Sequence, residues 1–235
     1  MNLAGENLSA GRWTASRKRR ILNSRLWAGE FVTRAVSAAA ARPKVVLQAS
    51  GVNYYGLTGD REVVESCPPG DDFLARVCVD WEASTAAVEG LGVRRVITRS
   101  GVVLSAQGGA LPRMLLPFRF FVGGRLGSGR QPFSWIHIAD EVGAMRFLIE
   151  NEAARGPFNL VAPQTLTNAE FSHEVGRAMG RPSLVPVPGF ALRVLFGEMA
   201  TVLLEGQRAA SRRLQEAGYS FRFPDIHSAL ADLLR

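Results

Sequence analysis

Short β-branched segments alternate with amphipathic helical segments in the first half of this chain, and that order constrains the fold most strongly. Residues 45–50 form an apolar run, which is typical of a strand buried on both faces of a parallel sheet. Apolar residues at helical spacing predict helices over residues 16–41 and 72–90, and residues 94–98 predict another strand. Together with a strand end at residues 1–5, this order predicts an α/β, doubly wound (Rossmann-like) parallel sheet.

The sequence contains no glycine-rich turn that leads into a helix. Neither G-x-G-x-x-G nor G-x-x-G-x-x-G occurs before a helical segment. Residues 1–5 are predicted to end an inner strand of the sheet, so the chain begins after the point where such a turn should stand. We therefore expect a sheet that lacks its first βαβαβ portion.

Composition bounds the protein class. With 235 residues and 47% hydrophobic content, the chain can bury one sizeable core, or one core and a small satellite. No apolar run approaches the ~20 residues of a membrane span, and the N-terminus has no secretory pattern, so we expect a cytoplasmic protein. Two cysteines form neither a disulfide framework nor a zinc quartet, and no Cys/His/Asp spacing predicts a metal site.

The chain is basic, with a net charge of +7 and a pI near 10.4. Its densest cluster runs from Arg17 to Arg20, with Arg25 just after, at the start of a predicted helix. No aromatic residues of the base-stacking kind are interleaved with these charges. We interpret the cluster as a solvated helix face and not as a nucleic-acid site.

The pattern changes after Gly101, where a substrate-side insertion is predicted. It comprises residues 111–121, a turn over 123–129 and an alternating strand over 133–138. Asp140 is predicted to cap a helix that runs through residue 150, because its carboxylate can accept from free helix amides.

The remainder of the chain divides into one more strand, one capped helix and a helical end. Residues 156–161 predict a strand, and residues 167–170 form a capping box that opens a helix ending at Gly180. From residue 186 the chain reads as a small helical module. We therefore predict a domain over residues 1–185 and a helical domain over 186–235.

A series of motifs occurs in one order along the chain and carries a family resemblance. The motifs are Asn2–Asn7, Tyr54–Gly56, Pro68–Phe73, Trp81–Glu82, Arg99–Leu104, Gly127–Gly129, Phe133–Ile138, Thr167–Phe171 and Leu204–Gln207. Together they resemble the epimerase-like, atypical branch of the extended short-chain dehydrogenase/reductase family. That branch ends in a small helical module of unknown function.

The resemblance implies a cofactor and a missing lead. Family members begin with a strand, the glycine-rich turn, a helix and two further strand–helix pairs, and since one βαβ unit takes about 30 residues, the absent lead is roughly 60 residues or more. Full-length relatives are expected to bind NADP or NAD, whose pyrophosphate sits on that turn. We expect an N-terminally truncated member, impaired in cofactor binding; a start assigned too late is the alternative.

The family's usual acid/base pair is replaced. Short-chain dehydrogenases use a Tyr as general acid/base and a Lys four residues later, because hydride transfer to a carbonyl needs a proton delivered in step. Alignment through Trp81-Glu82 places these positions at Leu74 and Cys78. Tyr54 and Tyr55 are the nearby phenols that could donate the proton instead, although packing is an equally ordinary role for them.

The resemblance also implies other site residues. Ser50 corresponds to the serine that orients a substrate hydroxyl or carbonyl, so the predicted catalytic set is Ser50, Tyr54 and Tyr55. The predicted cofactor-binding residues are Ala4, Gly5, Ser50 and Arg99, and the predicted substrate-binding residues are Arg130, Trp135 and His137. The alternative roles are ordinary ones: a glycine or serine that ends a strand, an arginine in a turn, and a hydrogen-bonded structural histidine.

Two classes of function follow from these residues. The first is a truncated NAD(P)-dependent oxidoreductase or nucleotide-sugar-epimerase-like protein, with a small-molecule substrate such as a nucleotide sugar. The second is a non-catalytic binding protein that uses the substrate cleft and the helical module. An open apolar sheet edge also predicts homo-oligomers, because unpaired strand amides and carbonyls can pair with another chain.

Overall fold

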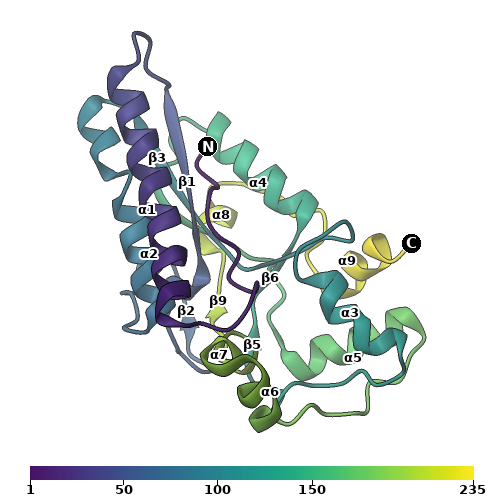
Figure 1. The fold of residues 1–235 in the computed structure, drawn as a ribbon. Coiled ribbons are helices and arrows are strands. Elements are labelled where there is room, and N and C mark those ends of the chain that lie inside the picture. Colours follow the sequence, from purple (N-terminus) through teal and green to yellow (C-terminus); the bar gives the residue numbers. More distant parts are fainter.

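The computed structural model describes residues 1–235 and is built on a three-stranded parallel sheet. The strand order is β1 (Val45–Gly51), β3 (Arg94–Ser100) and β7 (Gly156–Leu160). Asn2 forms a parallel bridge with Gln48 on the open side of β1, so the N-terminal segment lies along that edge of the sheet (Figure 1). The predicted α/β, Rossmann-like parallel architecture is confirmed.

Helices cover both faces of this sheet. On one face lie α1 (Ala15–Ala38) and α2 (Phe73–Ala83), and on the other lies α4 (Ile138–Glu150), as Figure 1 shows. The first two helices approach closely where Gly29 faces Ser84, since a Cβ on Gly29 would lie 1.8 Å from the Ser84 hydroxyl oxygen. The missing side chain lets the two helices share one layer.

Two predicted helices are shorter in the structure. The first ends at Ala38 instead of residue 41, and the second ends at Ala83, after which a 3₁₀ turn, η2 (Ala86–Leu91), replaces the expected continuation. The Ser84 hydroxyl donates a hydrogen bond of 2.6 Å to the carbonyl of Trp81. A serine that bonds the preceding turn competes with the helical ladder, which explains the early end.

Three small sheets connect the middle of the chain to its end. The pairs are β2 (Glu62–Val63) with β9 (Arg208–Ala209), β4 (Val102–Leu104) with β6 (Trp135–His137), and β5 (Pro132–Phe133) with β8 (Leu166–Thr167). The alternating strand predicted over 133–138 is therefore divided.

The division falls at Ser134. Its hydroxyl donates to the carbonyl of Gln207 at 2.7 Å and accepts from the amide of Ala209 at 3.1 Å. Ser134 thereby ties the middle of the chain to its C-terminal segment.

A different residue caps α4 from the one that the sequence predicts. The Nδ1 atom of His137 accepts from the Ala139 amide at 3.0 Å, so His137, and not Asp140, is the cap. The buried Asp140 carboxylate instead accepts from the amides of Arg222 and Phe223, at 2.8 and 2.9 Å. The predicted capping carboxylate therefore binds the distant segment over residues 222–223 and not the first turn of its own helix.

The C-terminal half shares its apolar cores with the rest of the protein. In the largest core, α9 (Ile226–Leu233) packs with α3 (Leu111–Arg119), α5 (Asn168–Met179) and the buried Trp135. The capping box of α5 is present as predicted, and Gly180 ends that helix with a left-handed φ of 61°.

The remaining helical elements are short. They are η1 (Val52–Tyr55), α6 (Gly189–Phe196), η3 (Gly197–Ala200), α7 (Thr201–Leu204) and α8 (Arg212–Glu216). None of the helices is both long enough and apolar enough to cross a bilayer. The predicted domain boundary at residue 186 stays a prediction.

Candidate active site

A cavity of about 590 Å³ opens where the parallel strands of the central sheet end. Val52 and Asn53 follow directly after β1, and Ser100 and Gly101 lie at the end of β3; all four line the cavity. Ligands of open α/β sheets bind outside the carboxyl ends of the strands. The cavity therefore occupies the expected position for a ligand site.

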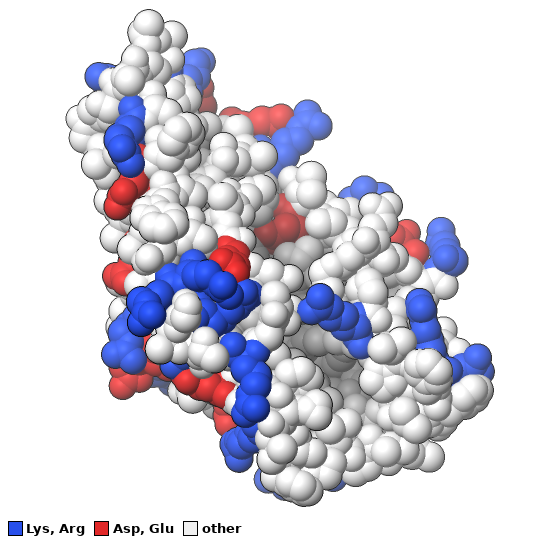
Figure 2. Space-filling model, in the orientation of Figure 1, with Lys and Arg blue, Asp and Glu red and all other residues white.

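Several parts of the chain form the other walls. They include the loop that contains Leu8, Ser9 and Trp13, the start of α2, α3, the segment around β5, the start of α5, and the segment from α6 to α7. Figure 2 shows the hollow in this face of the molecule, with Lys and Arg side chains on either side of it.

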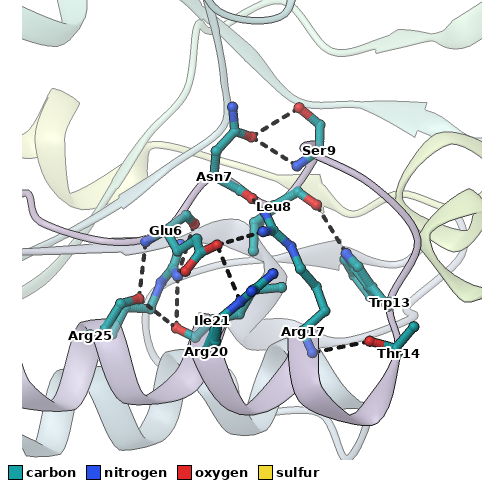
Figure 3. Close-up of polar contacts among 11 residues, drawn as sticks. Glu6, Asn7, Leu8, Ser9, Trp13, Thr14, Arg17, Arg20, Ile21 and Arg25 are labelled. Atoms are coloured by element: carbon teal, nitrogen blue, oxygen red, sulfur yellow. Dashed lines mark hydrogen bonds and ion pairs between the residues drawn. The ribbon is translucent and has the colours of Figure 1, made fainter.

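The loop over residues 6–13 is held against α1 by partly buried polar contacts, as Figure 3 shows. Arg17 Nη1 lies 2.5 Å from a Glu6 carboxylate oxygen, and the same guanidinium donates to the carbonyl of Asn7. The indole nitrogen of Trp13 donates to the carbonyl of Leu8 at 3.0 Å. These contacts position one wall of the cavity.

The basic cluster of α1 is only partly the solvated face that we expected. Arg17 and Arg25 are buried, whereas Arg19 and Arg20 are exposed. Arg25 Nη1 donates to the carbonyls of Glu6 and Ile21, and burial lowers the pKa of Arg25. The correction follows from residues 6–8, whose carbonyls and carboxylate need donors that only tertiary packing brings to them.

Ala4 and Gly5, predicted to bind a cofactor, are exposed and do not line the cavity. A Cβ on Gly5 would lie 3.0 Å from the guanidinium carbon of Arg25. The observed role of this glycine is therefore to leave space for the Arg25 side chain.

Ser50 and Arg99 belong to a buried polar network beneath the cavity. Arg99 makes two hydrogen bonds of 2.9 Å to the two carboxylate oxygens of Glu82, and the Ser50 hydroxyl donates to one of these oxygens at 2.7 Å. Neither Ser50 nor Arg99 lines the cavity. The network fixes the ends of β1 and β3 relative to α2.

The two predicted phenols also point into this network. The Tyr55 hydroxyl donates to Asn159 Oδ1 at 2.7 Å and accepts from Arg99 at 3.1 Å, and burial raises the pKa of Tyr55 to about 12. The guanidinium carbon of Arg99 lies 3.4 Å from the ring centroid of Tyr54. Neither tyrosine lines the cavity, and both rings contact Arg99.

None of the three predicted substrate-binding residues lines the cavity. Arg130 is exposed, and Trp135 is fully buried in the largest core. His137 stacks on Phe223 at 3.9 Å between ring centroids, and burial lowers its pKa. Trp135 and His137 lie on the same face of the strand, as the alternation predicts. However, α9 and the segment before it cover that face. The periodicity of the strand alone contains no information about this cover.

Two residues that the sequence did not single out form a polar pair at the sheet end of the cavity. The hydroxyl of Ser100 donates to Glu141 Oε1 at 2.5 Å, and the second carboxylate oxygen of Glu141 is buried without a partner. Burial raises the pKa of Glu141 to about 7. Ser100 lies within the motif Arg99–Leu104 and could have been identified there, whereas Glu141 reads as an ordinary acidic residue in the first turn of a helix.

The position at which the family has its acid/base tyrosine is occupied here by a leucine that faces the cavity. Leu74 lines the cavity, and Cys78 is buried one turn further along α2. The apolar Leu74 cannot exchange a proton, so a proton at this site must come from another side chain or from water.

The whole chain is similar to known proteins. It is 42% identical over 238 residues to epimerase family protein SDR39U1 of Mus musculus, covering 100% of this chain and 81% of that protein. It is 44% identical over 231 residues to epimerase family protein MT2273 of Mycobacterium tuberculosis, covering 98% of this chain and 76% of that protein. This chain belongs to the epimerase family.

Solved structures agree with that assignment. The crystal structure of human epimerase family protein SDR39U1 (isoform 2) with NADPH superposes with a TM-score of 0.95 at 40% identity, over 98% of this chain and 79% of that chain. MoeE5 in complex with UDP-glucose and NAD has a TM-score of 0.78 at 17% identity, over 99% of this chain and 76% of that chain, and so shares the fold alone. The expected resemblance to atypical short-chain dehydrogenases/reductases is confirmed.

The C-terminal segment matches a separate family model. Residues 187–233 match a domain of unknown function, DUF1731. The expectation that the chain lacks a leading segment stays a prediction.

Proposed function

We propose that this epimerase family protein is an NADP(H)-dependent oxidoreductase that acts on a small carbonyl compound. The observation that carries the proposal is the cavity of about 590 Å³ at the carboxyl ends of β1 and β3, in a chain that is 40% identical to a protein solved with NADPH. Asn53, Ser100 and Gly101 stand where a nicotinamide would meet a substrate. A bound nicotinamide would supply or accept a hydride.

The proposed proton source is Ser100 with Glu141 behind it. Reduction of a carbonyl consumes one hydride and one proton, and the proton must reach the carbonyl oxygen. Ser100 lines the cavity and contacts Glu141, whose pKa of about 7 suits proton exchange near neutral pH. Ser100 would pass its proton to the oxygen while protonated Glu141 replaces it.

The predicted catalytic and cofactor residues take supporting roles in this proposal. Ser50, Tyr54 and Tyr55 act as positioning residues, since with Arg99 they hold the strand ends from which Asn53 and Ser100 reach the cavity. Ala4 and Gly5 remain candidates only for the outer part of a cofactor.

We further propose that this 235-residue polypeptide binds NADPH weakly. Its sequence contains no glycine-rich turn whose amides could hold a pyrophosphate. Retained binding of a small molecule without turnover would instead favour the non-catalytic alternative.

The test combines NADPH titration, followed by nicotinamide fluorescence, with reduction of phenanthrenequinone at high NADPH. We expect affinity weaker than micromolar and measurable turnover. Ser100→Ala should lower kcat about a hundredfold, the order expected for a lost general acid. Ser128→Ala is the control, because Ser128 is exposed and outside the cavity lining.

Each result has a defined meaning. Micromolar affinity would contradict the weak-binding proposal, and wild-type turnover by Ser100→Ala would remove Ser100 from the reaction. Absence of both NADPH binding and turnover would contradict the proposed function.

A further inference from the structure

Hydrophobic residues make up about half of the cavity lining, and they favour a ligand with a large apolar surface. Of 38 lining residues, 20 are hydrophobic, and six of these are aromatic. These aromatic residues are Trp13, Phe73, Phe118, Phe133, Phe171 and Phe196. Such a surface stabilises a ligand mainly by removing apolar area from water.

The charges in the lining are few and mostly negative. The cavity is lined by one basic residue, Arg113, and by three acidic ones, Asp72, Glu198 and Glu205. Asp72 caps α2 by accepting from the Ala75 amide at 3.0 Å, so its carboxylate is already engaged. The formal charge of the lining is −2, and one of its carboxylates, Glu198, is ion-paired with Lys18 at 2.5 Å.

The single cation is also engaged. Arg113 Nη1 donates to the Ser9 hydroxyl at 2.8 Å, across the mouth between α3 and the loop over residues 6–13. A diphosphate carries two negative charges and is ordinarily held by arginine forks or helix amides. A nucleotide sugar would bring its diphosphate to a lining whose one basic side chain is Arg113.

The C-terminal helical segment supplies the outer wall of this cavity. Leu192 and Phe196 of α6, Met199 of η3 and Val202 of α7 all line it, whereas Val194 of α6 points to solvent and is 72% exposed. The segment matched by the DUF1731 model is thus in direct contact with any ligand held here.

From these observations we infer that the cavity takes a neutral, largely apolar carbonyl compound, not a nucleotide sugar, and that the helices α6–α7 select it. Because the same cavity would hold the reacting carbonyl, this ligand class depends on the oxidoreductase function proposed above. A cavity of about 590 Å³ suits a molecule of two or three fused rings or of equivalent volume.

The inference is tested with N-phenylnaphthylamine, a neutral probe whose fluorescence rises in apolar surroundings. We expect saturable binding of one probe per chain, displaced by phenanthrenequinone and unchanged by UDP-glucose. Val202→Glu places a further carboxylate in the lining and should weaken probe binding at least tenfold. Val194→Glu makes the same change on the outward face of the same segment and should leave the affinity within twofold.

Three results would overturn the inference: no saturable probe binding, displacement by UDP-glucose at the same concentration as phenanthrenequinone, or equal loss in the two valine variants. Circular dichroism of each variant shows that it is folded before its affinity is compared. NADPH binding is measured separately on the same protein. Probe binding with neither NADPH binding nor turnover would contradict the proposed function alone, and NADPH binding with UDP-glucose displacement would contradict the ligand class alone.

Discussion

At the scale of single residues, Glu141 makes stability depend on pH. Burial raises its pKa from the ordinary value of 4.5 to about 7, so the native protein keeps a proton that the unfolded chain releases. The contribution of Glu141 to native stability is therefore full below pH 4.5 and is lost as pH rises through about 7, a change on the order of 3 kcal/mol. Glu141→Gln should flatten this part of the profile.

The measurement is urea unfolding of both proteins at about pH 5 and about pH 8. The free energy of unfolding of the wild type should fall between the two values by more than that of Glu141→Gln. Parallel profiles would show that Glu141 titrates normally.

A second residue-scale prediction concerns Tyr55. Tyr55→Phe removes a hydroxyl that is buried between Asn159 and Arg99, and the unpaired groups should cost about 1–3 kcal/mol of stability. Tyr54→Phe is the matched control, since Tyr54 contacts Arg99 through its ring, and the expected change is below about 0.5 kcal/mol. Chemical denaturation measures both, and equal effects would contradict the assigned contacts.

At the scale of elements, α1 carries the loop that forms one wall of the cavity. Arg17→Ala removes the contacts with Glu6 and the Asn7 carbonyl, so we expect a loss of about 2 kcal/mol and greater solvent access to Trp13. Thermal unfolding and acrylamide quenching of tryptophan fluorescence measure the two effects. Arg19→Ala, at an exposed position of the same helix, should change neither, and an unaltered Arg17→Ala protein would count against the anchoring role.

At the scale of the whole molecule, the C-terminal segment belongs to the same core as the centre of the chain. Leu230 of α9 is fully buried in the core that contains Trp135, so Leu230→Ala should cost about 2–5 kcal/mol. The lower stability should appear as a single transition with a reduced midpoint. Leu195→Ala, at a position of α6 that is 62% exposed, is the control, and a separate early transition for Leu230→Ala would instead indicate two folding units.

The parallel sheet, the capped α5 and the family were predictable from the sequence, because they depend on local signals. The run over 45–50 reads as a buried strand whatever surrounds it, and the side chains of Thr167 and Glu170 each accept from the other residue's backbone amide. The order of short motifs along the chain likewise needs no coordinates. What these signals describe is how each segment folds with its own neighbours in sequence.

Only the tertiary structure decided which side chains reach the cavity. Trp135 and His137 alternate along their strand as predicted and Asp140 has the side chain of a helix cap, yet contacts with residues 219–232 bury all three. Ser100 and Glu141 lie 41 residues apart and meet only because β3 ends beside the first turn of α4. The sequence alone determined the elements and their order, and packing between distant segments decided the site, because burial and hydrogen-bond partners depend on what the rest of the chain places against each residue.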